Sequence, residues 1–473
     1  MLLGFLLSGF VPSAPAQSAL YELVIRNARV IDPESRLDAV RNLGIENGRI
    51  QAVSEAALEG RAYLEGESLV AAPGFIDLHQ HAHTPFDYWL KARDGVTLAA
   101  ELEVGTADVT SWYAARAGKS PIHFAVSVGH IPCRMAVAGD APSFLPDADS
   151  AGASAPLDAT KMKQLKALLE RGLREGATAV GLGLQYTPGA NQMETLEVFK
   201  VAAAYQAPCH VHLRFKGDKG IQNVFGAVLE VLACNSVTGA RAHVCHVQST
   251  ANQHTARVLD LLDQAHARGI DVSVECYPYT AGMTDIKSPI FNPGWQETTG
   301  ISYGDLQWAA TGERLTRESF ERYRRTGGMV ILHSNSEATI ETALAHPLTM
   351  VASDGIRGHP RNAGTCARVL GRYVREKGLL SLSQAVEKLS LQPAKHLETR
   401  VPALKNKGRI RPGADADLVL FDPVAITDQA TYEEPNLPSK GILHVLVGGT
   451  LIIKDGTPLE GALPGSAVRA PTP

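Results

Sequence analysis

Between residues 70 and 400, this chain of 473 residues alternates short apolar runs with longer stretches of helical pattern. Most successive runs are about 25 to 35 residues apart, the length of one strand–helix unit. Eight such units in a row are typical of a parallel (β/α)8 barrel, an α/β fold. We predict a TIM-like barrel over residues 71–404, with strands near Leu69–Leu78, Thr97–Val104, Phe124–Gly129, Ala179–Leu184, Cys209–Leu213, Ala242–Val247, Val272–Cys276 and Met350–Ser353.

Two intervals between these runs are longer than one unit. One contains the segment Gly139–Asp158, rich in Gly, Ala, Ser, Pro and Asp, and the other follows Tyr279. We expect both excess segments to be loops. The second also contains Met329–Ser334, an apolar run that could be a ninth strand. The strand count therefore stays open at this point.

Both ends of the chain show the alternating, β-branched pattern of antiparallel strands. Near the N-terminus the pattern starts at Tyr21, and Asn47-Gly48 is a hairpin signal. Near the C-terminus it covers Gly408–Asp422 and His444–Gly456. We predict that residues 17–70 and 405–463 form one small β-sandwich domain assembled from both ends, and that the tail 464–473 is disordered.

The first sixteen residues resemble a secretory leader. The apolar run Leu2–Val11 precedes Ala14-Pro15-Ala16, which resembles an A-x-A cleavage site, although the run is preceded by no Lys or Arg. We predict a signal peptide over residues 1–16 and a periplasmic or secreted protein; the location is cytoplasmic if the leader is not functional. No later segment reaches the ~20 apolar residues of a membrane helix, so we expect no membrane span.

Composition and charge restrict the partners. Hydrophobic residues make up 45% of the chain, which suffices for a large core. The formal charge is −4 and no basic block could follow a phosphate backbone, so we expect a small-molecule substrate and no nucleic acid. The six cysteines are scattered without a C-x-x-C pair, which favours buried thiols or an occasional metal ligand over disulfides. Nothing in the pattern bears on oligomeric state.

The first predicted barrel strand ends in His79 and His81. Residues two apart in a strand point to the same side, as two ligands of one metal require. Active sites of barrels lie where strands end and loops begin, so we expect both histidines to bind a metal. His83 shares their parity but lies further into the loop, and we keep it as an alternative ligand.

The second predicted strand carries two carboxylates, Glu101 and Glu103. A carboxylate buried at this position must be paired or coordinated, because burying an isolated charge is costly. A carboxylate that bridges two metals would meet this need. Glu103 lies nearer the strand end and is our choice of ligand, with Glu101 as the alternative. If no metal is bound, the buried carboxylate would instead be paired with an Arg or Lys side chain.

Three further strand ends carry possible ligands. The fifth and sixth runs contain His210 with His212 and His243 with His246, and the eighth ends at Asp354. His212 and His246 lie closer to their strand ends, so we choose them as ligands and regard the other two as packing or supporting residues. An aspartate at Asp354 is a candidate both for metal ligation and for proton transfer.

These motifs together resemble the amidohydrolase superfamily and, within it, the N-acyl-D-amino-acid deacylase (D-aminoacylase) branch. The resemblance covers nearly all of the chain after the leader. It rests on Pro73-Gly-Phe-Ile-Asp-Leu-His-Gln-His, Gly95-Val-Thr, Ser127-Val-Gly-His-Ile-Pro, His212-Leu-Arg, Tyr277-Pro-Tyr-Thr-Ala-Gly, Ser353-Asp-Gly, His359-Pro-Arg-Asn-Ala-Gly-Thr and Arg409-Ile-Arg-Pro-Gly-Ala-Asp-Ala-Asp-Leu. The first and last motifs mark the superfamily, and the middle ones select the branch.

The resemblance implies one tightly bound zinc ion (Zn2+) on Glu103, His212 and His246. It implies a second, weaker zinc site on His79, His81 and Asp354. It further implies that a substrate carboxylate binds Arg361 and that the pocket around it includes Tyr277, Tyr279 and Gln248.

The chain departs from the branch pattern in three places. The cysteine usual after Gly-Val-Thr is missing, with Glu101 and Glu103 nearby instead; Gln248 replaces a lysine and Met283 a serine. The first change keeps a negative bridging ligand, whereas the other two remove polar contacts to a carboxylate. No lysine lies on the fourth run, so we do not expect a carboxylated-lysine bridge.

We predict a zinc-dependent hydrolase of a carbon–nitrogen bond, acting on N-acyl-D-amino acids or related acyl amides, with Asp354 moving the proton. One alternative is another hydrolase on the same scaffold, such as a lactonase, a dipeptidase or a cyclic-imide hydrolase, because fold does not determine substrate. The other alternative is a relative that kept the barrel and lost its metals.

Overall fold

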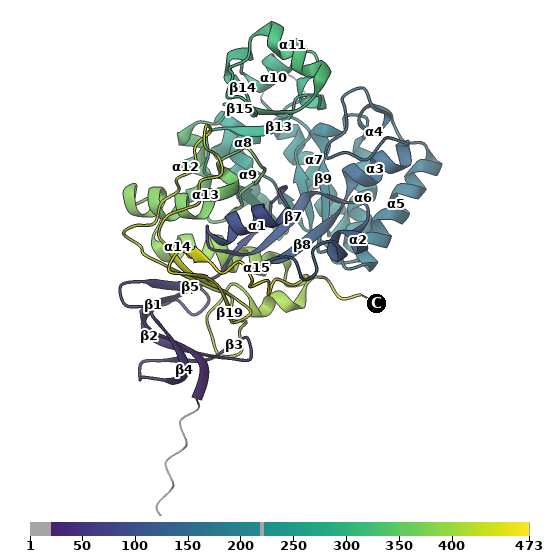
Figure 1. The fold of residues 1–473 in the computed structure, drawn as a ribbon. Coiled ribbons are helices and arrows are strands. Elements are labelled where there is room, and N and C mark those ends of the chain that lie inside the picture. The colour runs from purple at the N-terminus through teal and green to yellow at the C-terminus, as the bar shows by residue number, and fades with distance from the viewer. Residues whose placement is uncertain (1–19, 218–221, 473) are drawn as a thin grey trace, which may run out of the picture.

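The computed structural model describes residues 20–217 and 222–472 (Figure 1). The predicted leader, residues 1–16, lies outside this part of the chain. Within the described residues no helix is both long enough and apolar enough to cross a membrane.

The middle of the chain forms the predicted barrel. Eight parallel strands lie side by side in the order β16-β12-β11-β10-β9-β8-β7-β6, so that neighbours in space are neighbours along the chain. All eight predicted runs form these strands: β6 (Phe75–Asp77), β7 (Val96–Thr106), β8 (His123–Gly129), β9 (Val180–Gly183), β10 (Cys209–His212), β11 (Ala242–Val244), β12 (Val272–Cys276) and β16 (Thr349–Val351). The structure confirms the (β/α)8 class.

The first and last strands meet just beyond their ends and nearly close the barrel. The Gly355 amide donates to the His79 carbonyl at 3.1 Å, and the His81 amide donates to the Gly355 carbonyl at 2.7 Å. At the same seam the Asp77 carboxylate accepts from the Ser353 amide at 2.9 Å. These bonds bring the His79 segment directly against the Asp354 segment.

Helices surround the strands, and their sequences explain where they lie. In α5, Asp158 caps the first turn through the Lys161 amide, and leucines spaced four residues apart, Leu165, Leu169 and Leu173, face the core. The main helices of the ring are α1 (Pro85–Ala92), α2 (Val109–Ala114), α3 (His130–Ala138), α5 (Ala159–Arg174), α6 (Gln192–Ala204), α7 (Val224–Thr238), α9 (Thr255–His266), α12 (Glu337–Ala345) and α13 (Arg361–Arg368).

Both ends of the chain contribute to one nine-stranded mixed sheet beside the barrel (Figure 1). Its β2–β3 hairpin turns at Asn47-Gly48, where both residues have positive φ, as expected for this pair. The sheet contains β1 (Leu20–Asp32), β2 (Leu37–Glu46), β3 (Arg49–Ser54), β4 (Glu59–Glu65), β5 (Val70–Pro73), β17 (Leu418–Phe421), β18 (Ile442–Val447), β19 (Thr450–Lys454) and β20 (Thr457–Pro458).

The segment after Tyr279 is not the loop that we expected. It forms a small unit with a three-stranded sheet, β13 (Gly282–Asp285), β14 (Leu306–Trp308) and β15 (Met329–Leu332), and the helices α10 (Trp295–Thr299) and α11 (Arg317–Thr326). Trp295, Trp308 and Phe320 belong to a separate apolar core in this unit. The prediction of a loop was wrong because these apolar residues are dispersed along the sequence and come together only in the folded unit. The possible ninth strand is β15, which lies outside the barrel.

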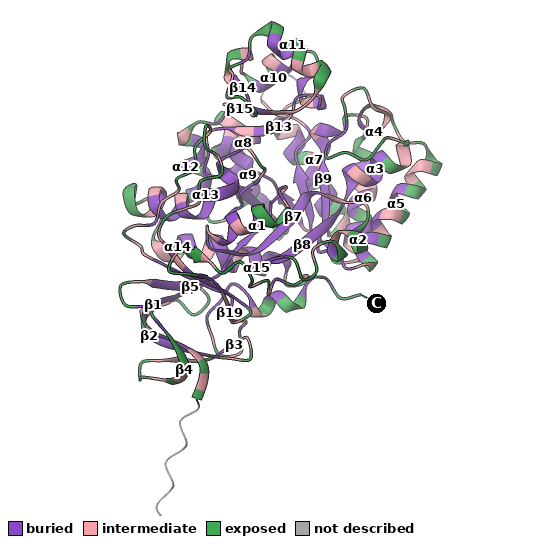
Figure 2. Ribbon diagram, viewed as in Figure 1, coloured by how far each residue is buried: buried purple, intermediate pink, exposed green. Residues whose placement is uncertain are grey.

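The C-terminal tail is ordered over the described residues, contrary to our expectation. Its chain runs beside β8: the Phe124 amide donates to the Ser466 carbonyl at 3.2 Å, and the Val468 amide donates to the Phe124 carbonyl at 2.9 Å. Val468 and Ala470 of the tail are buried. Figure 2 shows that much of the barrel interior is buried as well. The tail is ordered because its backbone finds partners on the barrel that local composition does not reveal.

The six cysteines are free and buried, which confirms the predicted thiols.

Candidate active site

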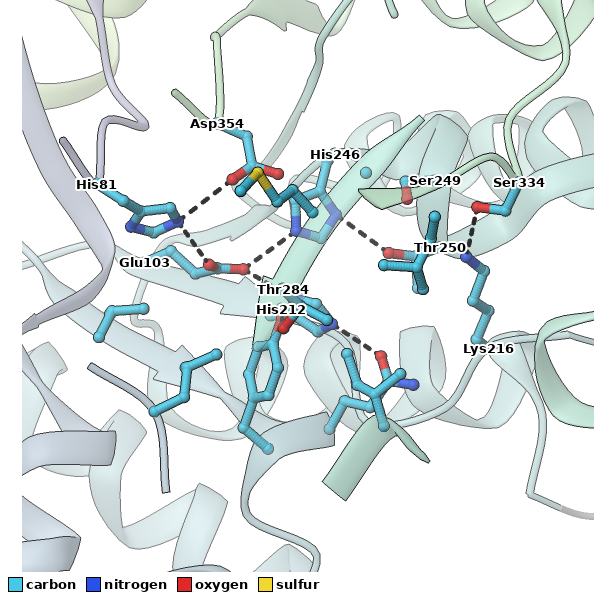
Figure 3. A pocket seen from close by; sticks show the side chains of 18 of the residues that line it. His81, Glu103, His212, Lys216, His246, Ser249, Thr250, Thr284, Ser334 and Asp354 are labelled. Atoms are coloured by element: carbon cyan, nitrogen blue, oxygen red, sulfur yellow. Dashed lines mark hydrogen bonds and ion pairs between the residues drawn. The ribbon is translucent and has the colours of Figure 1, made fainter. Parts of the chain in front are cut away.

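A pocket lies at the carboxyl ends of the barrel strands (Figure 3). Its floor includes Glu103, His212 and His246, and one wall includes Phe144 from the predicted loop Gly139–Asp158. The unit inserted after β12 contributes a further wall through Met283 and other residues. The two segments that lengthen the intervals between barrel strands, Gly139–Asp158 and the unit after Tyr279, thus enclose the strand ends.

The backbone of β7 places Glu103 at the centre of this floor. Pairing with β8 is interrupted between Glu101 and Thr106, so the strand bulges there. The bulged backbone lies against Gly181 of β9, where a Cβ atom would stand 2.2 Å from the Glu103 carbonyl oxygen. A glycine at this position is what allows β7 to approach so closely.

Glu103 forms a first possible metal group with two histidines. Its Oε1 lies 2.8 Å from His212 Nδ1 and 3.1 Å from His246 Nε2. The remaining ring nitrogens have partners of their own: His212 Nε2 lies 2.8 Å from Gln185 Oε1, and His246 Nδ1 lies 3.2 Å from Thr250 Oγ1. These partners orient both rings, as supporting residues do around bound metals.

A second possible metal group shares the same carboxylate. Glu103 Oε2 lies 3.2 Å from His79 Nε2 and 3.3 Å from His81 Nε2. Asp354 Oδ1 lies 3.5 Å from His79 Nε2 and 3.3 Å from His81 Nε2. His79, His81 and Asp354 therefore form one compact donor set, and Glu103 lies between the two sets.

The hydrogen bonds of His79 and His81 indicate that a cation belongs between them. His79 Nδ1 contacts the Glu275 carboxylate, and His81 Nδ1 lies 2.6 Å from Glu101 Oε2. In the neutral rings, Nδ1 protons donated to these carboxylates leave the two Nε2 atoms, 3.0 Å apart, as lone pairs. A metal ion satisfies both lone pairs at once, so the donor set fits a bound metal.

Electrostatics favours positive charge at the same place. Burial disfavours protonation of His79, but the carboxylates of Glu275, Glu103 and Asp354 outweigh it and raise the pKa of His79 well above its usual value. Burial likewise opposes ionisation of Glu103 and Asp354, yet the cationic neighbours of each lower the pKa of both carboxyl groups. The cluster is therefore built to hold a cation.

The residues that we kept as alternatives lie beside these two groups. Glu101 supports His81, and its Oε1 also accepts the Val104 amide at 3.1 Å. His83 Nε2 lies 3.5 Å from Glu101 Oε2. His210 and His243 lie deeper in the barrel, where they form a third donor set with Glu275.

Arg361, the predicted anchor for a substrate carboxylate, is paired with Asp354. Its Nη2 lies 3.0 Å from Asp354 Oδ2, and its guanidinium lies 4.6 Å from the centre of the Tyr277 ring. The side chain is fully buried and is not part of the pocket lining. Nε and Nη1 have no hydrogen-bond partner among the described residues, so two donors remain for a ligand. Its role toward substrate stays a prediction.

The other predicted substrate residues lie at different depths. Tyr277 lines the pocket, whereas Gln248 and Tyr279 do not. Gln248 Nε2 donates to the Tyr277 carbonyl at 3.1 Å, and the Tyr279 hydroxyl donates to Asp428 Oδ2 at 3.4 Å. Both residues therefore support the wall of the pocket.

Sequence reasoning missed three residues at the site: Glu275, Gln185 and Lys216. Glu275 is a carboxylate inside the apolar strand β12, the same signal that identified Glu103, and it could have been found. Gln185 and Lys216 follow strand ends without any local feature that distinguishes them.

Comparisons with known proteins point to one family. The model of the amidohydrolase family matches residues 70–452. The N-acyl-D-glutamate deacylase of Alcaligenes xylosoxydans xylosoxydans is 31% identical over 95% of this chain and 96% of that protein. The D-aminoacylase of the same organism is 28% identical over 92% of this chain and 95% of that protein.

A solved structure has a similar fold over most of the chain. It is the crystal structure of the N-acyl-D-glutamate deacylase from Bordetella bronchiseptica, complexed with zinc and a phosphonate inhibitor. The TM-score is 0.80 at 28% identity, and the match covers 96% of this chain and 100% of that one. With the family model matching most of its length and the donor sets in place at the strand ends, this chain belongs to the amidohydrolase family.

Proposed function

We propose that this amidohydrolase is a zinc-dependent deacylase of N-acyl-D-amino acids. The observation that carries the proposal is the pair of donor sets that meet at Glu103 on the floor of the pocket. The substrate class is supported by the relatives, which are named as deacylases of N-acyl-D-amino acids.

One zinc ion would be held by Glu103, His212 and His246, a set of one oxygen and two nitrogens that leaves a position open for substrate or water. A second would be held by His79, His81 and Asp354, with the other oxygen of Glu103. We expect the second site to be weaker, because Asp354 is shared with the Arg361 guanidinium. When bound, zinc supplies Lewis-acid polarisation of the amide carbonyl and of a water molecule.

Asp354 is the residue that moves the proton. One of its oxygens faces His79 and His81, and the other accepts from Arg361. Burial alone would protonate this carboxyl group, but Arg361 and the histidines lower its pKa and keep it ionised. As a base it accepts a proton from the attacking water, and it then donates that proton to the departing amine.

A substrate panel with and without added zinc tests the proposal. The wild-type protein should hydrolyse N-acetyl-D-amino acids, lose this activity after treatment with a chelator and regain it with zinc; the N-acetyl-L enantiomers are the matched controls. Hydrolysis of lactones, dipeptides or cyclic imides without any N-acyl-D-amino acid activity would contradict the assignment.

A further inference from the structure

The pocket carries one fixed cation that the proposed chemistry does not use. Among the described residues that line the pocket, Lys216 is the only lysine or arginine. It lies four residues beyond His212, after the end of β10. In Figure 3 it stands beside Ser334, on the opposite side of His246 from His81. Its ammonium group therefore faces the pocket away from the second donor set.

Among the described residues, Lys216 has no carboxylate partner of the kind that a partly buried ammonium usually has. Its Nζ donates to Ser334 Oγ at 3.4 Å, and it forms no ion pair with any carboxylate of the described residues. Burial lowers the pKa of Lys216 to about 8, and an anion placed beside it would raise that pKa again and stabilise the charged ammonium. Such a cation in a pocket wall is a binding position for an anionic group.

Arg361, the other cationic side chain near the site, differs from Lys216 because it has a carboxylate partner. Arg361 is already paired with Asp354 and lies behind the pocket surface. Lys216, by contrast, has the Ser334 hydroxyl as its hydrogen-bond partner among the described residues, and it lines the pocket directly. A substrate whose amide lies at the donor sets can therefore direct a second negative group toward Lys216.

We propose that Lys216 binds a carboxylate remote from the scissile amide, so that the enzyme prefers N-acyl-D-amino acids with a second carboxylate. This inference rests on the proposed function and narrows its substrate class. The second carboxylate could belong to the amino-acid side chain or to the acyl group. Both sources offer the same chemistry to the ammonium.

The experiment compares charged and neutral substrates of matched size. N-acetyl-D-glutamate is paired with N-acetyl-D-glutamine, and N-succinyl-D-alanine with N-pentanoyl-D-alanine. Each is assayed with the zinc-loaded wild-type enzyme and with Lys216→Met, Lys216→Arg and the control Lys163→Met, whose side chain is exposed on α5.

For one of the two pairs, wild type should favour the charged member by on the order of 10-fold or more in kcat/KM. Lys216→Met should abolish that preference, mainly through KM, while neutral substrates change less than about 2-fold. Lys216→Arg should retain part of the preference, and the control should retain all of it. The pair that responds identifies the source of the carboxylate.

Two outcomes would overturn the inference alone. One is hydrolysis of charged and neutral substrates at equal rates by the wild-type enzyme. The other is an equal loss for both members of each pair in Lys216→Met, which would place Lys216 at the carboxylate common to all N-acyl amino acids. If the zinc-loaded wild type hydrolyses none of these compounds, the proposed function itself fails, and this inference fails with it.

Discussion

Two groups of histidines occupy the barrel at different depths, and they differ in almost everything except residue type. The outer group, at the strand ends, consists of His79, His81, His212 and His246, and it faces carboxylates and the pocket. The inner group consists of His210, His243 and His396 and contacts its own members, Ser273 and the carboxylate of Glu275. His210 and His212 lie on one strand, two residues apart, yet belong to different groups.

In the inner group, His210 and His396 lie in surroundings that favour the neutral imidazole. His210 Nε2 lies 3.1 Å from His396 Nε2, and His243 Nδ1 lies 2.8 Å from Ser273 Oγ. Burial, together with the neighbouring imidazoles, lowers the pKa of His210 and His396 well below the usual value. In the outer group, carboxylates raise the pKa of His79 and His81 instead, whereas burial lowers the pKa of His212. The comparison teaches that the carboxylates at the strand ends, Glu101, Glu103 and Asp354, distinguish the outer histidines from the inner ones, whereas the imidazole itself does not.

One carboxylate joins the two groups. Glu275 contacts His79 Nδ1 with one oxygen, and its other oxygen lies 3.0 Å from His243 Nε2. It can therefore hold His79 in the tautomer whose Nε2 is free for a metal.

The largest contrast should come from His212→Ala and His210→Asn. His212→Ala removes a ligand and should abolish tight zinc binding and nearly all activity, with little change in the stability of the metal-free protein. His210→Asn should keep its zinc and instead lower the melting temperature, because it disrupts buried packing. Metal analysis and thermal unfolding of both variants measure this. Full zinc occupancy in His212→Ala would remove it from the ligand set.

Asp354→Asn tests whether the carboxylate of the outer group performs chemistry. The substitution keeps the size and removes the proton acceptor, so kcat should fall by about 10²–10⁴-fold with KM little changed. Asp149→Asn, at an exposed position, is the control. Steady-state kinetics with added zinc gives both parameters. A variant that retains more than about a tenth of the wild-type kcat would exclude this role.

Glu275→Gln tests the connection between the groups. Loss of the charge behind His79 should weaken binding at the second metal site by about 10- to 100-fold, the usual cost of removing such a supporting partner. Competition with a chelating dye measures the two affinities separately, and the first site serves as the internal control. Unchanged affinity at both sites would mean that the two groups act independently.

The smallest effect should come from His396→Gln. Because the folded-state pKa of His396 lies below its unfolded value of about 6.5, the unfolded chain binds more protons as the pH falls below that value. The stability that neutral His396 contributes is therefore present above pH ~6.5 and is lost on acidification, by on the order of 1 kcal/mol per histidine at pH ~5.5. Thermal unfolding of the metal-free protein between pH 7.5 and 5.5 should show a shallower loss in the variant than in wild type. Parallel curves would show that His396 does not contribute to the acid sensitivity.

The sequence by itself determined the barrel and the identity of most residues at its mouth. Each strand is a short, mainly apolar run, and the two-residue spacing of His79 and His81, just beyond the end of β6, predicts that both point to one side. Both properties are local, so the residue order alone encodes them. The ordered tail and the unit after Tyr279 escaped prediction because their backbone and apolar partners lie far away in sequence.

Only the tertiary structure decided which charged groups meet. Glu101 and Glu103 have the same parity, and it is the bulge of β7 against Gly181 that directs Glu103 between the donor sets and leaves Glu101 behind His81. Likewise, the pairing of Arg361 with Asp354 and the position of Lys216 in the pocket wall depend on how loops fold over the strand ends. Apolar periodicity is a property of neighbouring residues, whereas the partner of a buried charge is selected by contacts between distant segments.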